Sequence, residues 1–273
     1  MMTPTPAVAL TIAGSDSGGG AGIQADLVTF AAFEVHGTSA ITAVTAQNTV
    51  GVSAVVTIDP DVIEAQVRSV TDDFMVRATK TGMLATAPIV ERVAALAASG
   101  ILGPLVVDPV MVSTTGATLL DADAVQAVRD ALLPSAALVT PNRAEAELLT
   151  GIAITSIEAQ RAAAQRLVEL GARAALVKGG HLDGPDAIDI LFDGRNVVEL
   201  RAPRVWTRND HGTGCTLSAA ICACLARGLT LPRAVEEAKA YVTRGLADGA
   251  DWGLGTGRGP FSHFAKGRPA VVA

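Results

Sequence analysis

Short apolar runs alternate with longer amphipathic stretches along most of this chain. The apolar runs are bounded by turn-forming residues such as Gly, Pro and Asp, a pattern typical of strands that lead into turns. The predicted strands occupy residues 8–13, 41–45, 52–58, 76–79, 105–109, 137–141 and 174–178. Two further runs, 188–192 and 197–200, are joined across Asp193-Gly194 and predict a hairpin.

The stretches between these runs predict helices with recognisable start and stop signals. Asp59-Pro60 begins one helix, because Pro is favoured at the first helical position, and Ile63, Val67 and Val70 then share one face. Other predicted helices are 86–99, which ends at Gly100, one that opens with a capping box at Thr155-Ser156-Ile157-Glu158 and stops at Gly171, and two that follow residue 212.

Strands that alternate with helices predict an α/β fold with a mainly parallel central sheet covered on both faces. No long linker, internal repeat or low-complexity segment interrupts the pattern, so we expect residues 1–273 to form a single domain. In such sheets, ligands bind outside the carboxyl ends of the strands. Most of the chemically informative residues of this chain fall at those predicted ends.

The composition narrows the classes of function. A net charge of −6 and a pI near 5.2 argue against nucleic acid as a partner, because no basic stripe is present to neutralise phosphates. The three cysteines lie between residues 215 and 224 without the spacing of a zinc site, which favours reduced thiols in the cytoplasm. No apolar run approaches the roughly 18 residues of a membrane span, and no signal peptide is indicated.

Residues 211–218, His-Gly-Thr-Gly-Cys-Thr-Leu-Ser, form the most informative segment. Gly212 and Gly214 allow a tight turn, and the following residues predict a helix, so successive N–H groups would converge at its positive end. Such an end binds phosphate or a developing oxyanion, and Thr213 lies within it. Cys215 falls in the first turn, where we expect the same field to lower its pKa and to make it a candidate base. The alternative is a glycine-rich helix start with a buried thiol.

The first loop, residues 14–22, is also rich in glycine. It matches a loose dinucleotide fingerprint at Gly20-x-Gly22-x-x-Ala25, but that fingerprint also needs an acidic residue roughly 20 positions further on. Residues 35–58 contain no Asp or Glu, which disfavours a nicotinamide oxidoreductase. A phosphate-loop NTPase is disfavoured because no Gly-Lys-Ser/Thr tripeptide follows the glycines.

Two polar residues near this loop are open to two interpretations each. Asp26 is either a solvent-facing carboxylate near a helix start or an acceptor that points back into the loop. Gln47 ends a predicted strand, and its amide both donates and accepts, which suits the edge of an aminopyrimidine ring. Its alternative role is to bind the backbone of its own loop.

Three further residues at strand ends suggest a phosphate and metal site. Asp108 ends one strand, and Asn142 and Glu145 follow another, one helical turn apart. Oxygen ligands so placed suit a Mg²⁺ ion held mainly through water and ligand phosphates, although each residue could instead be a helix cap. Lys178 closes an apolar strand, and it would meet either a phosphate or a carboxylate such as Asp183 or Asp186.

These motifs together resemble the hydroxymethylpyrimidine/phosphomethylpyrimidine kinases of thiamine biosynthesis, in the ribokinase-like superfamily, over nearly the whole chain. The segments that carry the resemblance are 9–16 (ALTIAGSD), 18–27 (GGGAGIQADL), 45–49 (TAQNT), 80–84 (KTGML), 108–111 (DPVM), 140–142 (TPN), 178–181 (KGGH), 211–220 (HGTGCTLSAA) and 257–264 (GRGPFSHF).

The resemblance implies a three-layer α/β/α sandwich, usually dimeric, that phosphorylates a pyrimidine alcohol and then its monophosphate with ATP and Mg²⁺. It implies the following roles: Gln47, Asp26, Gly14, Met83 and Val110 at the pyrimidine; Gly212, Thr213 and Gly214 as the anion hole; Cys215 as the base; Lys178 at phosphates; and Asp108 and Glu145 at the metal.

One departure and two competing functions accompany the resemblance. Asp210 stands where the family usually has a neutral residue, and its carboxylate would slightly weaken nucleotide binding. A pyridoxal kinase of the same superfamily is the closest alternative function. A catalytically silent pyrimidine sensor on the same fold is a second, although the intact base, lysine and anion hole argue against it.

Overall fold

The structure is a computed structural model that describes residues 5–111, 122–180 and 184–265. Within these residues, nine strands form one mixed sheet in the order β3-β2-β1-β4-β5-β6-β7-β8-β9. The strands are β1 (Val8–Asp16), β2 (His36–Gln47), β3 (Val52–Thr57), β4 (Val76–Thr81), β5 (Leu105–Val107), β6 (Leu138–Val139), β7 (Ala175–Val177), β8 (Asp186–Phe192) and β9 (Val197–Pro203). Six neighbouring strands pair in parallel, in the order β2, β1, β4, β5, β6 and β7. Strand β3 joins antiparallel at one edge, and β8 and β9 join antiparallel at the other.

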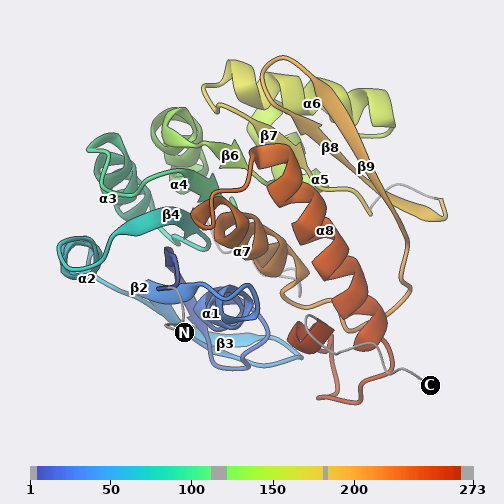
Figure 1. Cartoon of the computed structure of the whole chain (residues 1–273), viewed down its shortest axis with the longest axis horizontal. Helices are drawn as coiled ribbons and strands as arrows, with labels where there is room; N and C mark the ends of the chain where they lie inside the picture. Colours follow the sequence, from blue (N-terminus) through green and yellow to red (C-terminus); the bar gives the residue numbers. More distant parts are fainter. Residues whose placement is uncertain (1–4, 112–121, 181–183, 266–273) are drawn as a thin grey trace.

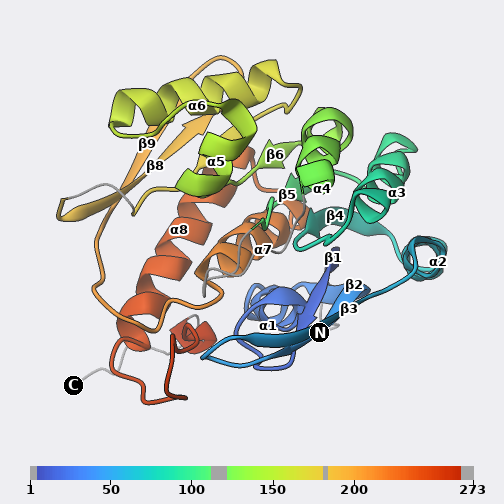
Figure 2. The ribbon, with the colours of Figure 1, turned by 180° about the vertical axis from the view of Figure 1, so that it is seen from behind.

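Helices cover both faces of this sheet (Figures 1 and 2). Helices α1 (Gly22–Ala32), α7 (Thr213–Ala226) and α8 (Leu231–Asp248) lie on one face. The other face carries α2 (Pro60–Thr71), α3 (Ala87–Ala98), α4 (Ala122–Ala127), α5 (Arg143–Thr150) and α6 (Ile157–Glu169). Short π and 3-10 turns complete the helices at Val128–Leu132, Leu133–Ser135 and His263–Ala265. The predicted three-layer α/β/α sandwich is therefore confirmed.

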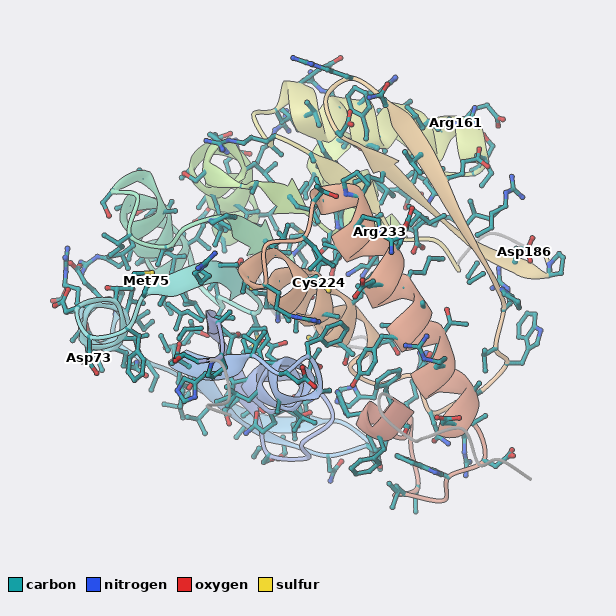
Figure 3. All side chains as sticks on the ribbon, viewed as in Figure 1. Asp73, Met75, Arg161, Asp186, Cys224 and Arg233 are labelled. Carbon is teal, nitrogen blue, oxygen red and sulfur yellow. The ribbon has the colours of Figure 1, made fainter. Side chains whose placement is uncertain are left out.

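Two hydrophobic cores hold these layers together, one on each side of the sheet. The core under α7 and α8 includes Phe30, Ile221 and Tyr241, all with no exposed surface. Cys222 and Cys224 are also buried there, and Cys224 is labelled on α7 in Figure 3. The opposite core includes Ile63 and contains mostly aliphatic side chains from α2, α3, α4 and α6. Small residues in α7 allow this helix to approach the sheet closely.

The predicted elements are present, with two differences at their ends. Several strands run longer than the apolar runs that predict them, because polar residues such as Asp16 and Gln47 still pair in the sheet. The predicted capping box at Thr155-Ser156-Ile157-Glu158 is wrong, because Ser156 is the cap and its hydroxyl accepts from Ala159 N. A reciprocal box instead opens α5, between Asn142 and Glu145.

Candidate active site

A cavity of about 750 Å³ opens at the carboxyl ends of the parallel strands. Strands β1, β2, β4, β5 and β7 each deliver lining residues at or just beyond their ends, as the strand order requires. All but one of the predicted site residues line this cavity, namely Gly14, Gln47, Met83, Asp108, Val110, Glu145, Lys178, Gly212, Thr213, Gly214 and Cys215. The exception is Asp26.

The N-terminus of α7 forms the centre of the cavity wall. Gly212 is its cap, with a φ of 82°, and a Cβ added there would lie 1.7 Å from the Gly20 carbonyl oxygen. Only glycine fits this close approach of the two glycine-rich loops. A Cβ added at Gly214 would lie 3.2 Å from Lys178 Nζ, so the lysine ammonium borders the helix start. The helix dipole and this ammonium together favour an anion at that point.

Asp16 organises the first glycine-rich loop. Its carboxylate accepts from the backbone N–H groups of Gly18, Gly20 and Ala21, and Oδ2 lies 3.0 Å from His211 Nε2. Burial alone would raise the pKa of Asp16, but the hydrogen bonds from His211 and from the backbone outweigh burial and lower it. The loop is therefore held by an ionised carboxylate from its own strand.

Cys215 lies in the first turn of α7, as predicted, but its electrostatics differ from the prediction. Burial raises the pKa of the thiol to about 11; the nearby Lys80 lowers it, and Asp108 and Asp26 raise it further. The prediction that the helix terminus lowers this pKa is wrong, because loss of hydration outweighs the dipole. The resting side chain is therefore a thiol, and it must lose its own proton before it can act as a base.

Asp26 takes neither of its two predicted positions. Its side chain has no exposed surface, and both carboxylate oxygens bind Lys80 Nζ, at 2.8 and 3.0 Å, while Thr11 Oγ1 donates to Oδ2 at 2.6 Å. Asp26 does not line the cavity, whereas its partner Lys80 does, so the expected contact of Asp26 with a substrate stays a prediction. Asp26 orients Lys80, a residue to which the sequence assigned no role.

A second buried ion cluster joins the ends of β5, β6 and β7. Lys178 Nζ lies 2.9 Å from Asp108 Oδ1 and 4.0 Å from Glu145 Oε2. Lys178 thus pairs with the two predicted metal carboxylates and not with Asp186, one of the partners considered above. The other, Asp183, lies outside the described residues, as does His181 of the same motif.

Glu145 takes one of its two predicted roles, that of a helix cap, and its role at a metal stays a prediction. Its Oε2 accepts from Asn142 N at 2.7 Å, and Asn142 Oδ1 accepts from Glu145 N at 3.0 Å, which is the capping box of α5. Burial raises the pKa of Glu145 to about 7; Lys178 lowers it, and the neighbouring Asp108 raises it further. Two carboxylates therefore share one ammonium at the edge of the cavity. That imbalance is what a cation would relieve.

The donor set favours a hydrated cation. Among the described residues, no group of three His, Cys, Asp or Glu side chains could hold a metal ion. Two buried carboxylates beside a lysine and a helix N-terminus fit Mg²⁺ that keeps its waters and binds phosphates directly, since Mg²⁺ loses water reluctantly.

The opposite end of the cavity is less charged. Gln47 ends β2, and its Nε2 lies 3.3 Å from His211 Nε2 while its Oε1 accepts from Thr45 Oγ1 at 3.3 Å. A Cβ added at Gly14 would lie 2.6 Å from Met83 Cε, so the methionine side chain fills the space that the glycine leaves. An amide beside apolar groups is suited to a small polar ring.

Several lining residues were missed by the sequence analysis. Lys239 Nζ lies 2.7 Å from Asp189 Oδ2, and Asp189 Oδ1 accepts from Gly179 N at 2.7 Å. These two side chains hold the turn that follows Lys178. No sequence signal distinguished them, because Asp189 lies within an apolar run and Lys239 within an amphipathic helix.

Asp210, the departure noted in the sequence, faces a cation. Arg258 Nε donates to Asp210 Oδ1 at 2.8 Å, and Arg258 Nη2 also binds Asp210 Oδ2. Both side chains line the cavity. Arg258 sits inside a motif that the sequence analysis quoted, but its partner could not be read from spacing.

Comparison with known proteins identifies what the chain is similar to. A family model described as phosphomethylpyrimidine kinase matches residues 16–262. A hydroxymethylpyrimidine/phosphomethylpyrimidine kinase of Rhizobium meliloti is 53% identical over 264 residues, covering 95% of this chain and 98% of the relative. A second kinase with the same description, from Streptomyces coelicolor, is 51% identical over 259 residues and 95% of each chain.

The fold also matches solved structures over nearly the whole chain. The Staphylococcus aureus pyridoxal kinase in complex with AMP-PCP and pyridoxal superposes with a TM-score of 0.89 at 35% identity, covering 97% of this chain and 96% of that one. The match places this sheet and its helices in the ribokinase-like fold. No helix among residues 5–111, 122–180 and 184–265 has both the length and the apolar character needed to span a membrane.

Proposed function

The chain belongs to the phosphomethylpyrimidine kinase family, and from this premise we propose that it uses ATP to phosphorylate 4-amino-5-hydroxymethyl-2-methylpyrimidine. A second transfer would convert the resulting monophosphate to the diphosphate that thiamine diphosphate biosynthesis consumes. The observation that carries this proposal is the placement of Gln47, the α7 N-terminus and Lys178 in one cavity. Under this proposal, the acceptor site, the transfer point and the phosphate site would lie around one cavity.

At the acceptor end, Gln47 would bind the aminopyrimidine edge, with Gly14, Met83 and Val110 around the ring. A primary amide can satisfy a ring nitrogen and an exocyclic amine together. Asp26 would act indirectly, since it fixes Lys80 behind this wall.

At the transfer point, the N–H groups of Gly212, Thr213 and Gly214 would hold the moving phosphoryl group. Phosphoryl transfer depends mainly on in-line positioning and charge neutralisation. The helix dipole and Lys178 would supply the charge neutralisation next to Gly214. Because burial raises the pKa of Cys215 to about 11, the thiol would first release its own proton to water, and the resulting thiolate would then accept the proton of the substrate hydroxyl.

Mg²⁺ would be held through water by Asp108 and Glu145 and directly by the nucleotide phosphates. When bound, it supplies positive charge that offsets the phosphates during transfer. Lys178, between the two carboxylates, would keep them in place and would contact a phosphate with the hydrogen atoms that they leave free.

A homodimer in the cytoplasm completes the proposal. Strand β3 carries Val55 and Val56, which are 44% and 65% exposed, and Val44 of β2 is 48% exposed. Val44 and Val56 are partners in the register and form an apolar surface on one face at the antiparallel edge of the sheet, which a second copy of the chain could cover, whereas Val55 lies on the opposite face. The oligomeric state can be checked by light scattering, with Val56→Asp as a variant that should shift a dimer to monomer.

A coupled assay of ADP release tests the proposed function. The purified chain is supplied with ATP, Mg²⁺ and one acceptor at a time: hydroxymethylpyrimidine, its monophosphate or pyridoxal. We expect turnover with both pyrimidines and a kcat/KM for pyridoxal well below theirs. Faster turnover of pyridoxal than of the pyrimidines would instead indicate a pyridoxal kinase, like the structural neighbour. Binding of a pyrimidine without ADP release would indicate a sensor.

A further inference from the structure

The Asp210–Arg258 ion pair has no role in the proposal so far, although both residues line the cavity. Its location is set by the backbone on both sides of Arg258. Arg258 N donates to Thr49 O at 3.0 Å, and Gly259 O accepts from His211 N at 3.1 Å. Figures 1 and 2 show this red segment after α8 beside the tip of the β2–β3 hairpin.

These contacts place Arg258 between the acceptor end of the cavity and the transfer point. Thr49 lies two residues beyond Gln47, the residue at the acceptor end. His211 contacts Gln47 and directly precedes the anion loop that begins at Gly212. The guanidinium of Arg258 therefore borders the region where an acceptor hydroxyl or an acceptor phosphate must meet the transferred group.

Four other cationic side chains line the cavity. Three are paired with buried carboxylates, and the fourth lies in a different part of the cavity. Lys80, Lys178 and Lys239 pair with Asp26, Asp108 and Asp189, each carboxylate side chain being at most 8% exposed. The Arg204 guanidinium binds the carbonyl groups of Gly180 and Gly184 and lies 5.1 Å from the centre of the Trp206 ring, in the part of the cavity next to β8 and β9.

The Asp210–Arg258 pair differs in its exposure. The Arg258 side chain is 49% exposed and that of Asp210 is 29% exposed. Ion pairs exposed to water contribute only about 0–1 kcal/mol, so such a pair can exchange partners at little cost. A phosphate offers an arginine two oxygens in the geometry that its fork of N–H groups matches.

We propose that Arg258 binds the phosphate group of the monophosphate acceptor in the second transfer, and that Asp210 holds Arg258 in place during the first. This inference rests on the proposed function and deepens it. The alcohol carries no charge for Arg258 to bind, whereas the monophosphate carries about −1.5 to −2 near neutral pH. Two phosphate groups must then approach each other, and Arg258 supplies the charge that offsets their repulsion on the acceptor side.

The test compares the two acceptors with the same protein. For R258Q, we expect the ratio of kcat/KM for the monophosphate to kcat/KM for the alcohol to fall about tenfold or more, since a charge-assisted bidentate contact is lost. D210N should raise the same ratio, because Arg258 no longer has a competing carboxylate. R258K should fall between R258Q and the parent. An exposed arginine on α8, Arg233 (Figure 3), pairs with Glu236 outside the cavity, so R233Q serves as the matched control and should leave the ratio unchanged.

Binding measured without nucleotide gives a second readout. By calorimetry, R258Q should weaken binding of the monophosphate more than binding of the alcohol. Equal losses for both acceptors, or no change in the ratio for R258Q and D210N, would overturn the inference while leaving the kinase assignment intact. If the parent phosphorylates neither acceptor, the proposed function itself fails. Melting curves for each variant identify misfolding, and D210N then carries the test, because it keeps the arginine.

Discussion

Asp16 Oδ2 and His211 Nε2 lie 3.0 Å apart and join two glycine-rich loops that are 195 residues apart in the chain. The first loop receives its shape from the Asp16 carboxylate, and the second begins directly after His211. His211 also contacts Gln47, so one imidazole links the acceptor end of the cavity to the anion loop. The two loops are therefore positioned as a unit.

Cys215→Ala should reduce kcat for the alcohol by about 10² to 10⁴, the usual effect of losing a general base. The loss should be smaller for the monophosphate, because a phosphate monoester ionises near pH 6 and needs no base at higher pH. Single-turnover rates with each acceptor at pH 8 measure this difference.

Cys222→Ala is the matched control for that variant. Cys222 is buried in the core on the same helix and does not line the cavity. It should reduce the melting temperature and retain turnover. Near-normal turnover of the alcohol by Cys215→Ala would remove Cys215 as the base.

Gln47→Leu should raise KM for the pyrimidine far more than KM for ATP. The substitution leaves ring donors and acceptors without partners, at a cost of roughly 1–3 kcal/mol. Steady-state kinetics with each substrate varied in turn give both KM values. Gln126→Leu, at an exposed site that contacts Asp130, is the control, and it should change neither value. Equal effects of Gln47→Leu on both KM values would mean that Gln47 only supports its loop.

Lys178→Met should reduce both stability and ATP-dependent turnover. Its removal leaves Asp108 and Glu145, which are 2% and 4% exposed, without their ammonium. Breaking a buried pair in this way costs roughly 3–5 kcal/mol. A melting curve alone therefore does not separate a structural role from a phosphate role.

The double variant Lys178→Met/Asp108→Asn separates these two roles. Relative to Lys178→Met it removes one of the two carboxylates left without an ammonium, so the melting temperature should recover in part, while turnover should stay below that of Asp108→Asn alone because the phosphate has lost its cation. Recovery of turnover together with stability would show that Lys178 serves only the carboxylates.

Gly212→Ala should impair both folding and phosphoryl transfer. Its φ of 82° and the 1.7 Å contact of an added Cβ with Gly20 O force the two loops apart. Gly228→Ala isolates the effect of the backbone conformation, since Gly228 has a φ of 88° and nothing within 4 Å of an added Cβ. Gly228→Ala should cost about 1–2 kcal/mol in unfolding experiments and keep its KM for ATP. If Gly212→Ala behaves in the same way, the contact between the loops is not needed for activity.

His263 should lower the free energy of unfolding as the pH falls from about 6.5 to about 4, whereas Glu145, whose pKa is raised to about 7, acts in the opposite direction. Burial lowers the pKa of His263 to about 4, from an ordinary value of 6.5, and its Nε2 lies 3.1 Å from Thr216 Oγ1. In this range the unfolded chain binds a proton that the folded chain does not, so acid favours unfolding. The 2.5-unit difference corresponds to about 3 kcal/mol.

Urea unfolding at a series of pH values measures this contribution. The curve of His263→Gln should lack this contribution and diverge from the parent curve between pH 6.5 and 4, whereas the curve of the exposed control His36→Gln should run parallel to the parent. An unchanged slope in His263→Gln would assign the acid sensitivity to other groups.

Much of the fold follows from local pattern. Apolar runs and helix signals such as Asp59-Pro60 located the elements, because each depends on residues close in the chain. Where strands begin was less predictable, since β2 begins at His36 and not at residue 41, and His36 pairs with Val8 of a strand that its own neighbours do not reveal. The capping box predicted at 155–158 is absent, and one forms instead between Asn142 and Glu145 of another helix. Several neighbouring residues can cap a helix, and the packed structure selects one of them.

The residues of the site were easier to find than their charges. Spacing brought Asp108, Glu145 and Lys178 to one edge, but it could not show that the lysine pairs with both carboxylates. The position of Cys215 at a helix start was right, and its pKa was wrong, because burial depends on the whole packed structure and the dipole on one helix. Asp26 is a further case, since its partner Lys80 comes from a strand 54 residues away.

Completion of the cavity depends on the order in which the chain is synthesised, because the segment that carries Arg258 is made after the two glycine-rich loops. His211 N and His211 O both bond to this segment, at Gly259 O and Phe261 N. Ribosomes deliver the first glycine-rich loop early, then the anion loop, and the bonding partners of His211 only after residue 258. During translation, the partially made chain can therefore build most of its sheet while its acceptor site stays unfinished. The acceptor site would be complete only after residue 261 has left the ribosome.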